Sequence, residues 1–501
     1  MARVVVVGAG MGGLAVAARL ATVGHDVEVI EAAETWGGKL GTWSRQGFTF
    51  DTGPSLLTLP AVYRELFAST GAPLEDVVEL IPVDPVARYR FPASEGHDIT
   101  WLDVPNASRP ALCAALDHAL GPGAGADWGR FLDRAHAIWQ VTRGPFLESP
   151  LGGGRDLVRL ARRTSDVRTV APWRTLRGLG RDQLRDPRLR MFLDRYATYA
   201  GSDPRRAPAA LAVIPYVEQT FGAWYARGGV RRLGDALHDR ALLRGARLRT
   251  GTRVARILLD AGRVSGVGLE DGSVLHADVV VTDIDARTVY TELLPRALAA
   301  RSLRHLDRAT PSLSGFVLLL ALRGRTAGLA HHTVLFSADY DAEFDAVFGR
   351  DAQPIDDPTV YVSAPDDPAL RPDDDHEAWF VLVNAPRHGA GRGAVDWDTP
   401  WRASAYADHL LDVMAARGLD VRDRVLWREI RTPADLERST GSPGGAIYGT
   451  SSNGARAAFL RPANASPVPG LFLVGGSAHP GGGLPLVGLS AAIVAKLVGP
   501  A

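Results

Sequence analysis

Residues 3–31 read RVVVVGAGMGGLAVAARLATVGHDVEVIE, and this stretch decides the fold. The β-branched run at 3–7 has no polar alternation, which predicts a strand buried on both faces of a parallel sheet. Glycines follow at once, residues 14–23 have the pattern of a helix, and residues 27–31 predict a second strand that ends on an acid. This order is a complete βαβ unit, which is typical of dinucleotide-binding domains.

The three glycines of the turn have separate tasks in such a unit. Gly8 allows the tight turn out of the strand, Gly10 lets a pyrophosphate approach the backbone, and Gly13 lets the helix pack against the sheet. The N-terminus of the helix supplies free N–H groups and the positive end of a dipole for phosphates. Glu31 stands where a carboxylate accepts hydrogen bonds from ribose hydroxyls, and its charge disfavours a 2′-phosphate. We therefore expect an unphosphorylated adenosine dinucleotide.

A second glycine-rich segment after Glu31 indicates which dinucleotide binds. Residues 37–39 read GGK and residues 51–54 read DTGP. A nicotinamide dehydrogenase would more often continue directly into its next helix, whereas flavin enzymes hold an extended FAD with a second such segment. The first glycine turn is the only intact GxGxxG after a strand, so we expect FAD as the cofactor and no separate nicotinamide domain.

Composition narrows the remaining possibilities. The 501 residues are 46% hydrophobic and 22% charged, enough for two or three domains with a large buried core. The 56 basic and 56 acidic residues cancel, which gives no case for nucleic acid as a partner. The single cysteine, Cys113, cannot form an internal disulfide, and no Cys/His set has zinc spacing, so we expect no metal. Without a signal-peptide pattern or an apolar run of about 20 residues, we expect a cytoplasmic protein that contacts the inner face of the cell membrane only peripherally.

The patterns along the rest of the chain predict further strands and helices. Residues 252–285 alternate short apolar runs with Gly and Asp turns, which predict a β-meander and a return strand at 277–282. Residues 127–195 have a mainly helical pattern, and 205–240 predicts a strand or loop followed by a helix after Gly228-Gly229. Other strand patterns lie at 311–386 and at 471–474, the latter before a terminal helix.

Together these patterns predict an α/β (α+β) protein with a Rossmann-like FAD-binding domain, an inserted mixed-sheet substrate domain and a helical, membrane-facing region. We assign the FAD-binding domain to 1–62, about 228–290 and 465–501, the substrate-binding domain to about 63–125 and 291–464, and the helical region to about 126–227.

Several segments resemble one family, the phytoene desaturase family of carotenoid desaturases in the FAD-dependent amine-oxidase-like superfamily. The N-terminal VVVVGAGMGGLAVAARL and FDTGPSLLTLP are shared by many flavin oxidoreductases. More specific are RYATYAGSDPRRAPAALAVIPYVEQTFGAWYARGGVRRLGDAL, at 195–237, and GLFLVGGSAHPGGGLPLVGLSAAIVAKLVG, at 470–499. The GGSAHPGGGLPLVGLSA version resembles carotenoid 3,4-desaturases of the hydroxyneurosporene or methoxyneurosporene dehydrogenase type more than enzymes that act on phytoene itself.

The resemblance also implies which residues would hold FAD. It assigns Gly8, Gly10 and Gly13 to the pyrophosphate, Glu31 to the ribose, Val254 to the adenine, Gly38, Lys39, Gly53, Pro54 and Ser55 to the path toward the flavin, Gly475 and Gly476 to the ribityl chain, and the backbone N–H groups of Leu486 and Val487 to the flavin ring. Many flavin enzymes carry an acid at the position of Gly476, so here the ribityl contact would be made by backbone alone.

The implied reaction takes a hydride from an allylic carbon to flavin N5 and a proton from the neighbouring carbon, with a quinone or O₂ as the final acceptor. An apolar tunnel that fixes the polyene and excludes water would supply most of the effect, so few catalytic side chains are expected. Glu218, among aromatic residues, is the candidate base, against a solvated or helix-capping glutamate. His479 would tune the flavin ring or hold its turn by a hydrogen bond, and we expect Arg195 in a structural ion pair.

Several alternatives stay open. The arginine-rich stretch 155–190, interleaved with apolar residues, suits either the headgroup layer of an anionic membrane or a solvated helical face. Instead of 3,4-desaturation, the chain could act as a phytoene desaturase proper, a carotenoid terminal oxygenase, an FAD-dependent carotenoid cis/trans isomerase or an amine oxidase. A non-enzymatic prenyl carrier of the Rab escort type is disfavoured by the intact flavin glycines, and an amine oxidase by the apolar HPGGGLPLV segment.

Overall fold

The computed structural model describes residues 1–151, 163–454, 457 and 461–501. Its parallel sheet has the order β10-β2-β1-β14-β22, and every neighbouring pair is parallel. The strands are β1 (Arg3–Val7), β2 (Asp26–Ile30), β10 (Arg247–Arg249), β14 (Val279–Thr282) and β22 (Leu471–Leu473). The predicted Rossmann-like sheet is confirmed, and the carboxyl ends of its strands share one edge.

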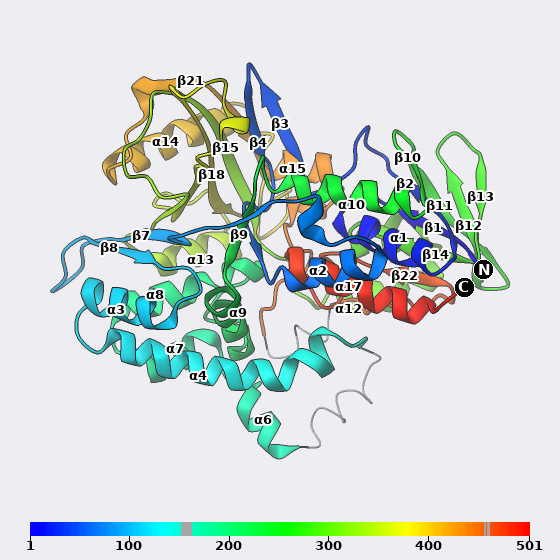
Figure 1. Ribbon diagram of the computed structural model, residues 1–501, viewed down its shortest axis with the longest axis horizontal. Helices are drawn as coiled ribbons and strands as arrows, with labels where there is room; N and C mark the ends of the chain where they lie inside the picture. The colour runs from blue at the N-terminus through cyan, green and yellow to red at the C-terminus, as the bar shows by residue number, and fades with distance from the viewer. Residues whose placement is uncertain (152–162, 455–456, 458–460) are drawn as a thin grey trace.

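Both faces of this sheet are buried, as the valine run of β1 predicts. Val4 and Val6 pack in one apolar cluster, whereas Val5 and Val7 pack in another. The first cluster contains α1 (Met11–Thr22), α2 (Ala61–Thr70), α10 (Arg231–Leu243) and α17 (Leu484–Val498), grouped around the sheet in Figure 1. The second contains β11 (Val254–Asp260), β12 (Arg263–Leu269), β13 (Val274–His276), α11 (Ala286–Thr288) and α12 (Arg296–Leu306). The predicted β-meander and its return strand are therefore confirmed.

A second, seven-stranded mixed sheet has the order β21-β15-β18-β17-β16-β7-β8. Its strands are β7 (Ala87–Phe91), β8 (Thr100–Val104), β15 (Ser314–Arg323), β16 (His332–Leu335), β17 (Val360–Ser363), β18 (His376–Ala385) and β21 (Val425–Arg431). β7 runs parallel to β16, so this pair attaches an early hairpin to strands much later in the chain. Helices α14 (Arg402–Ala416) and α15 (Pro433–Thr440) pack on β15, β17 and β18.

A helical layer packs against β7, β8, β16 and α13 (Tyr340–Phe348) in one apolar cluster. Figure 1 shows it as the lower part of the molecule. Its helices are α3 (Arg109–Leu120), α4 (Ala124–Thr142), α6 (Thr164–Val170), α7 (Leu176–Gln183), α8 (Pro187–Arg195) and α9 (Val213–Phe221). The helical pattern predicted for 127–195 is confirmed where the structure describes it, whereas 152–162, with the first arginines of the arginine-rich stretch, lie outside the described residues.

One prediction for this layer was wrong. Residues 213–221 were expected as strand or loop but form α9, because Pro215, Glu218 and Gln219 recur at helical spacing on its buried face. The helix predicted after Gly228-Gly229 is observed as α10. Within the described ranges, no helix is long and apolar enough to cross a membrane.

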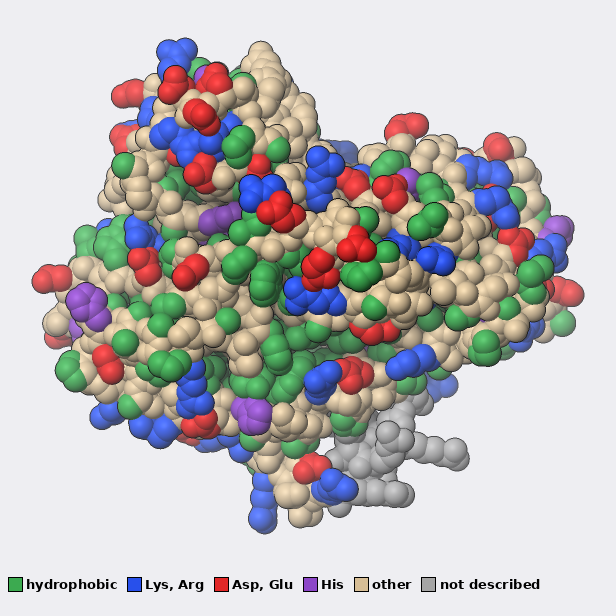
Figure 2. Space-filling view, viewed as in Figure 1, with side chains coloured by type: hydrophobic (Ala, Val, Ile, Leu, Met, Phe, Trp, Pro, Cys, Tyr) green, Lys and Arg blue, Asp and Glu red, His purple; other side chains and the backbone are tan. Residues whose placement is uncertain are grey.

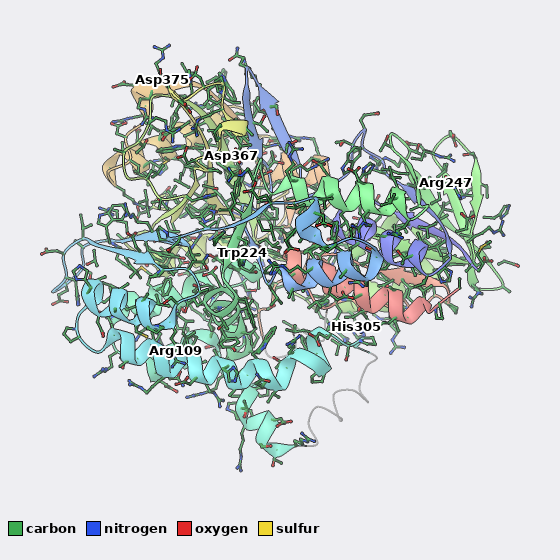
Figure 3. All side chains as sticks on the ribbon, viewed as in Figure 1. Arg109, Trp224, Arg247, His305, Asp367 and Asp375 are labelled. Carbon is green, nitrogen blue, oxygen red and sulfur yellow. The ribbon has the colours of Figure 1, made fainter. Side chains whose placement is uncertain are left out.

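Short strands join the layers. The three-stranded sheet β5-β9-β6 links β5 (Leu57–Thr58), β9 (Ala223–Ala226) and β6 (Leu80–Pro82). Trp224 of β9, labelled near the centre of Figure 3, pairs with Leu57 and lies beneath the Arg64 guanidinium at 5.6 Å. This strand therefore places the chain that follows Gly53 beside α9. The remaining strands are β3 (Thr42–Arg45) with β4 (Phe48–Asp51), and β19 (Arg387–His388) with β20 (Ala394–Val395).

Candidate functional site

The glycine turn between β1 and α1 lies at the carboxyl edge of the parallel sheet. The N–H of Gly8 donates to the Ile30 carbonyl oxygen at 2.8 Å, and Gly8 has a φ of +99°, which favours glycine. A Cβ on Gly13 would lie 2.1 Å from the Gly8 carbonyl oxygen, so α1 reaches its place only without a side chain there. These are the tight turn and the close packing that the sequence predicts for the two residues.

The second glycine segment lies directly against the first. The N–H of Gly37 donates to the Ala9 carbonyl oxygen at 2.8 Å, and a Cβ on Gly38 would lie 3.3 Å from Gly10 Cα. A Cβ on Gly53 would lie 1.9 Å from the Lys39 carbonyl oxygen. The structure thus brings both glycine-rich segments to the same edge of the sheet, where an extended dinucleotide would cross both.

Glu31 lies directly after β2 at this edge. Its carboxylate accepts hydrogen bonds from the N–H groups of Ala9 at 2.7 Å and Ala33 at 2.8 Å, which hold it beside the glycine turn. Val254, the first residue of β11, packs in the same apolar cluster as Val7 and Ile30, the last residues of β1 and β2. A carboxylate and an apolar wall therefore stand together at the adenosine end of the predicted site.

Lys39 extends from the second glycine segment toward the C-terminal part of the chain. Its Nζ donates to the carbonyl oxygens of Ala446 at 3.0 Å and Ile447 at 2.7 Å. Desolvation by the surrounding protein lowers the pKa of Lys39, and the negative charges of Asp285 and Asp283 oppose this shift. The side chain nevertheless keeps contact with solvent. An amine that is surrounded by protein and still accessible to solvent fits a position along a cofactor channel.

The segment after β22 completes the edge. A Cβ on Gly12 would lie 3.0 Å from the backbone of Gly475, so this turn and the first glycine turn are in close approach. The Gly476 carbonyl oxygen accepts from Nη1 of Arg461 at 2.7 Å. At the start of α17, the Val487 N–H already donates to the Gly483 carbonyl oxygen at 3.0 Å, whereas helix geometry leaves the Leu486 N–H without an acceptor inside the helix.

These features fit FAD. The glycines carry no side chain of their own where a pyrophosphate needs close approach, a helix N-terminus faces the same space, and a carboxylate stands at the ribose position. One side chain from another segment, that of Asp283, reaches into this space.

Asp283, which no sequence motif marks, also lies within this edge. The residue follows β14, and its Oδ2 accepts from the Gly13 N–H at 2.7 Å. Burial raises the pKa of Asp283 to about 7, with the Glu31 charge adding to the rise and the Gly13 N–H and Lys39 opposing it. Its position directly after a predicted buried strand was the available signal, because the carboxyl ends of parallel strands share one edge.

A second group of polar side chains surrounds Glu218 in the helical layer. Glu218 is 2% exposed, and its Oε1 accepts from the Tyr196 hydroxyl at 2.6 Å. Among the described residues, its Oε2 has no hydrogen-bond partner. Burial raises the pKa of Glu218 to about 7, against the Tyr196 hydrogen bond and the charge of Arg195. Glu218 is therefore an enclosed carboxyl group with one open acceptor atom, and not the solvated glutamate of the alternative interpretation.

A chain of contacts connects this group to the second glycine segment. The Ser55 hydroxyl forms a short hydrogen bond with the Tyr361 hydroxyl. The Arg195 guanidinium lies over the rings of Tyr361 at 5.6 Å and Tyr199 at 5.8 Å. The predicted ion pair of Arg195 was wrong: among the described residues no carboxylate lies within 4.0 Å of its nitrogens, because aromatic faces surround the guanidinium. Because the Arg195 charge also acts on the Glu218 carboxyl group, Ser55 and Glu218 belong to one polar cluster.

His479 is fully buried in the turn between β22 and α17. Its Nε2 lies 3.0 Å from the Ser149 carbonyl oxygen, and its own carbonyl oxygen accepts from Ser490 Oγ and Asn464 Nδ2, each at 2.8 Å. Burial lowers the pKa of His479 to about 4, which keeps the ring neutral near pH 7. These contacts favour the interpretation in which His479 holds its turn.

A groove of about 730 Å³ lies between α2, α17 and the end of α4. Much of its lining is apolar, with Val62, Trp139, Leu147 and Leu489 among the contributing residues. Figure 2 shows hydrophobic side chains gathered at the centre of the displayed face, where the part of the molecule containing α2 and α17 meets the helical layer. The groove therefore offers an apolar surface beside the helices that flank the parallel sheet.

Comparisons with known proteins agree with this geometry. Residues 11–353 match the family described as flavin containing amine oxidoreductase. The chain is 34% identical over 496 residues to a 4,4′-diapolycopene oxygenase of Methylomonas sp, covering 98% of this chain and 97% of that one. It is 33% identical over 509 residues to a hydroxyneurosporene desaturase of Rubrivivax gelatinosus, covering 99% and 92%.

The solved structure of wild-type putrescine oxidase bound to putrescine has a similar fold, with a TM-score of 0.64, 15% identity, and coverage of 99% of this chain and 98% of that one. At that identity the likeness concerns the fold alone. With relatives at 33–34% identity along almost its whole length, the chain belongs to the phytoene desaturase family of carotenoid desaturases, within the flavin containing amine oxidoreductases, and is an FAD-dependent oxidoreductase of that type.

Proposed function

We propose that this chain is a carotenoid 3,4-desaturase of carotenoid biosynthesis, which removes a hydride and a proton from adjacent carbons of an apolar polyene and leaves a C=C bond. The observation that carries the proposal is the enclosed, singly hydrogen-bonded carboxyl group of Glu218, connected through Arg195 and Tyr361 to the segment predicted to face the flavin. Such a reaction needs one proton acceptor in an apolar enclosure and little else.

The residues predicted from the sequence would hold FAD along the edge of the parallel sheet. Gly8, Gly10 and Gly13 would receive the pyrophosphate, Glu31 the ribose, and Val254 would lie against the adenine. The remaining contacts would come from Gly38, Lys39, Gly53, Pro54, Ser55, Gly475, Gly476, Leu486 and Val487. When bound, FAD would supply the hydride acceptor at flavin N5, and a quinone or O₂ would serve as the final electron acceptor.

Glu218 would accept the proton at Oε2. A pKa of about 7 matches this task near neutral pH, because the group is partly ionised yet basic enough to take a proton. The Tyr196 hydroxyl fixes the carboxyl plane through Oε1, and the nearby Arg195 charge favours the ionised form between turnovers. His479 would act on this site only by holding the turn before α17.

The substrate enters from a membrane in this proposal, and the apolar groove is the proposed entrance. Helix α6 packs on α4, whose C-terminal end lines this groove, since Nη2 of Arg134 donates to the Arg168 carbonyl oxygen at 2.8 Å. Trp173, which follows α6, is 66% exposed and offers a contact with lipid headgroups. Ion pairs such as Arg185–Asp127 favour a structural role for part of the arginine-rich stretch, so the proposed peripheral contact rests on the groove and Trp173.

The substrate class follows from the C-terminal segment GGSAHPGGGLPLVGLSA and from the relatives. We propose a 1-hydroxy- or 1-methoxyneurosporene type of carotenoid, whereas the relative from Methylomonas sp is named as an oxygenase. Phytoene desaturation and terminal oxidation are therefore the alternatives that the test must separate.

Purified, FAD-loaded protein in liposomes with a quinone is given 1-hydroxyneurosporene or phytoene, and products are measured by absorption and mass. We expect a red-shifted product of 1-hydroxyneurosporene that has lost two hydrogens. Conversion of phytoene alone would reassign the substrate, and a gain of oxygen would indicate a terminal oxygenase. An isomer of unchanged mass would indicate an isomerase. Consumption of amines without any carotenoid product would contradict the proposal altogether.

A further inference from the structure

The carboxylate of Asp283 lies in the space that the glycine turns leave open. A Cβ on Gly10 would lie 2.5 Å from its Oδ2, and a Cβ on Gly12 or Gly475 would lie 2.5 Å or 2.1 Å from its Oδ1. The Gly13 N–H, at the start of α1, already donates to Oδ2 at 2.7 Å. Asp283 therefore takes up hydrogen-bond donors and space at the helix N-terminus where a pyrophosphate would bind.

The backbone fixes this position. The N–H of Asp283 donates to the Val7 carbonyl oxygen at 2.8 Å, which continues the parallel ladder between β14 and β1 by one residue. Because the ladder holds the Cα beside the glycine turn, the Asp283 side chain stays at this edge of the sheet in every rotamer. An anionic Asp283 and an anionic pyrophosphate would then be close neighbours, which is electrostatically costly.

We propose that Asp283 couples cofactor binding to proton uptake: the site binds the FAD pyrophosphate with Asp283 protonated, as a hydrogen-bond donor to a phosphate oxygen. This inference rests on the proposed FAD site and not on the proposed carotenoid substrate. Protonation removes the like charge and turns the competing acceptor into a donor. The proton comes from solvent, and no other bond changes.

The charged and titratable groups around Asp283 favour protonation of its carboxylate near neutral pH. Titratable neighbours come from three segments: Glu31 after β2, Lys39 in the second glycine segment and Tyr63 on α2. Asp285 before α11 and Arg461 act on Lys39 in turn. Burial and the Glu31 charge raise the pKa of Asp283 to about 7 in the cofactor-free protein, and two phosphate charges would raise it further.

The test measures FAD binding to the full-length apoprotein by quenching of flavin fluorescence between pH 6 and pH 9. With a free-protein pKa of about 7, the Kd should be nearly constant below pH 7 and weaken about tenfold per pH unit above it, to about tenfold by pH 8 and about a hundredfold by pH 9. Asp283→Asn keeps the acceptor for Gly13 and loses the charge, so its Kd should be flat across this range and tighter than wild type at pH 9.

A matched control removes a neighbouring charge outside the turn. Asp285 accepts from the Arg287 N–H at 2.9 Å, and Asp285→Asn should keep the wild-type slope. A second measurement needs no variant: FAD added to weakly buffered wild-type apoprotein at pH 8 should take up close to one proton, and almost none at pH 6, as read by an indicator dye. Tight binding without pH dependence, a slope that survives Asp283→Asn, or no proton uptake at pH 8 would each overturn the inference while leaving the FAD site intact. Failure to bind FAD at any pH would overturn the site and this inference together.

Discussion

Replacing Glu218 by glutamine should change stability and activity in opposite directions above pH 7. Burial raises the pKa of this carboxyl group from 4.5 to about 7, so the folded protein holds the proton more tightly than the unfolded chain does. Glu218 therefore does not lower the free energy of unfolding below about pH 4.5, where it is protonated in both states. Above that pH its destabilising effect grows, and it levels off once the pH has passed 7. At pH 8 that cost is about 3 kcal/mol, which Glu218→Gln removes.

The assay compares wild type and variant by calorimetry at pH 4.5 and pH 8. For a chain of 501 residues, an unfolding entropy of about 2 cal/mol/K per residue converts about 3 kcal/mol into about 3 °C of Tm. The difference in Tm between Glu218→Gln and wild type should therefore be about 3 °C larger at pH 8 than at pH 4.5. In the same preparations desaturation should fall by about 10²–10⁴-fold, because an amide cannot accept the proton.

Glu343→Gln is the matched control, since Glu343 is also fully buried but both of its oxygens are occupied. Oε2 accepts from the Thr359 N–H at 2.8 Å and Oε1 from Asn384 Nδ2 at 2.7 Å. This variant should lose stability through those contacts and keep its turnover per bound flavin. A Glu218→Gln enzyme with wild-type turnover would refute the role of Glu218 as proton acceptor, and a Tm difference independent of pH would refute its raised pKa.

Three further substitutions test the fold around the site. Gly13→Ala places a Cβ 2.1 Å from the Gly8 carbonyl oxygen, so the protein should purify without flavin or fail to fold; a wild-type ratio of flavin to protein absorbance would contradict this. Tyr63→Phe removes the hydrogen bond from the Tyr63 hydroxyl to the Leu484 carbonyl oxygen, at 2.9 Å, and should lower the Tm by about 1 °C, for a loss of about 1 kcal/mol. Phe192→Ala should cost about 3–5 kcal/mol in the core of the helical layer, seen as a fall of several degrees in Tm, and an unchanged Tm would show that this cluster is loosely packed.

The sequence predicts the parallel sheet well because its signals are local. Each element is predicted from a few neighbouring residues: the strand from the valine run of β1, the turn from its glycines, and the end of the second strand from Glu31. The pairing of β7 with β16 could not be predicted, because it depends on contacts between segments that are far apart in the chain. Nothing in the sequence of either strand indicates which strand it pairs with. Helix α9 was missed because its apolar residues also suit a strand, and burial of Glu218 and Gln219 decides between the two.

The candidate site divides in the same way. Glycines at fixed spacing predict where a cofactor approaches the backbone, since their function is to lack a side chain. Such a pattern does not predict where a side chain from another segment points. The entry of Asp283 into the glycine turn, and the aromatic enclosure of Arg195 in place of an ion pair, arise from packing between elements that are far apart in sequence.

The most direct test of an FAD-dependent carotenoid desaturase is the anaerobic reduction of the bound flavin by substrate alone. FAD-loaded protein in liposomes is mixed with 1-hydroxyneurosporene in the absence of quinone and O₂, and flavin absorbance and product are recorded together. We predict that the flavin bleaches with one polyene double bond formed per flavin reduced, and that Glu218→Gln bleaches at least a hundredfold more slowly. A flavin that stays oxidised while the carotenoid is unchanged or only isomerised would contradict hydride removal by this enzyme.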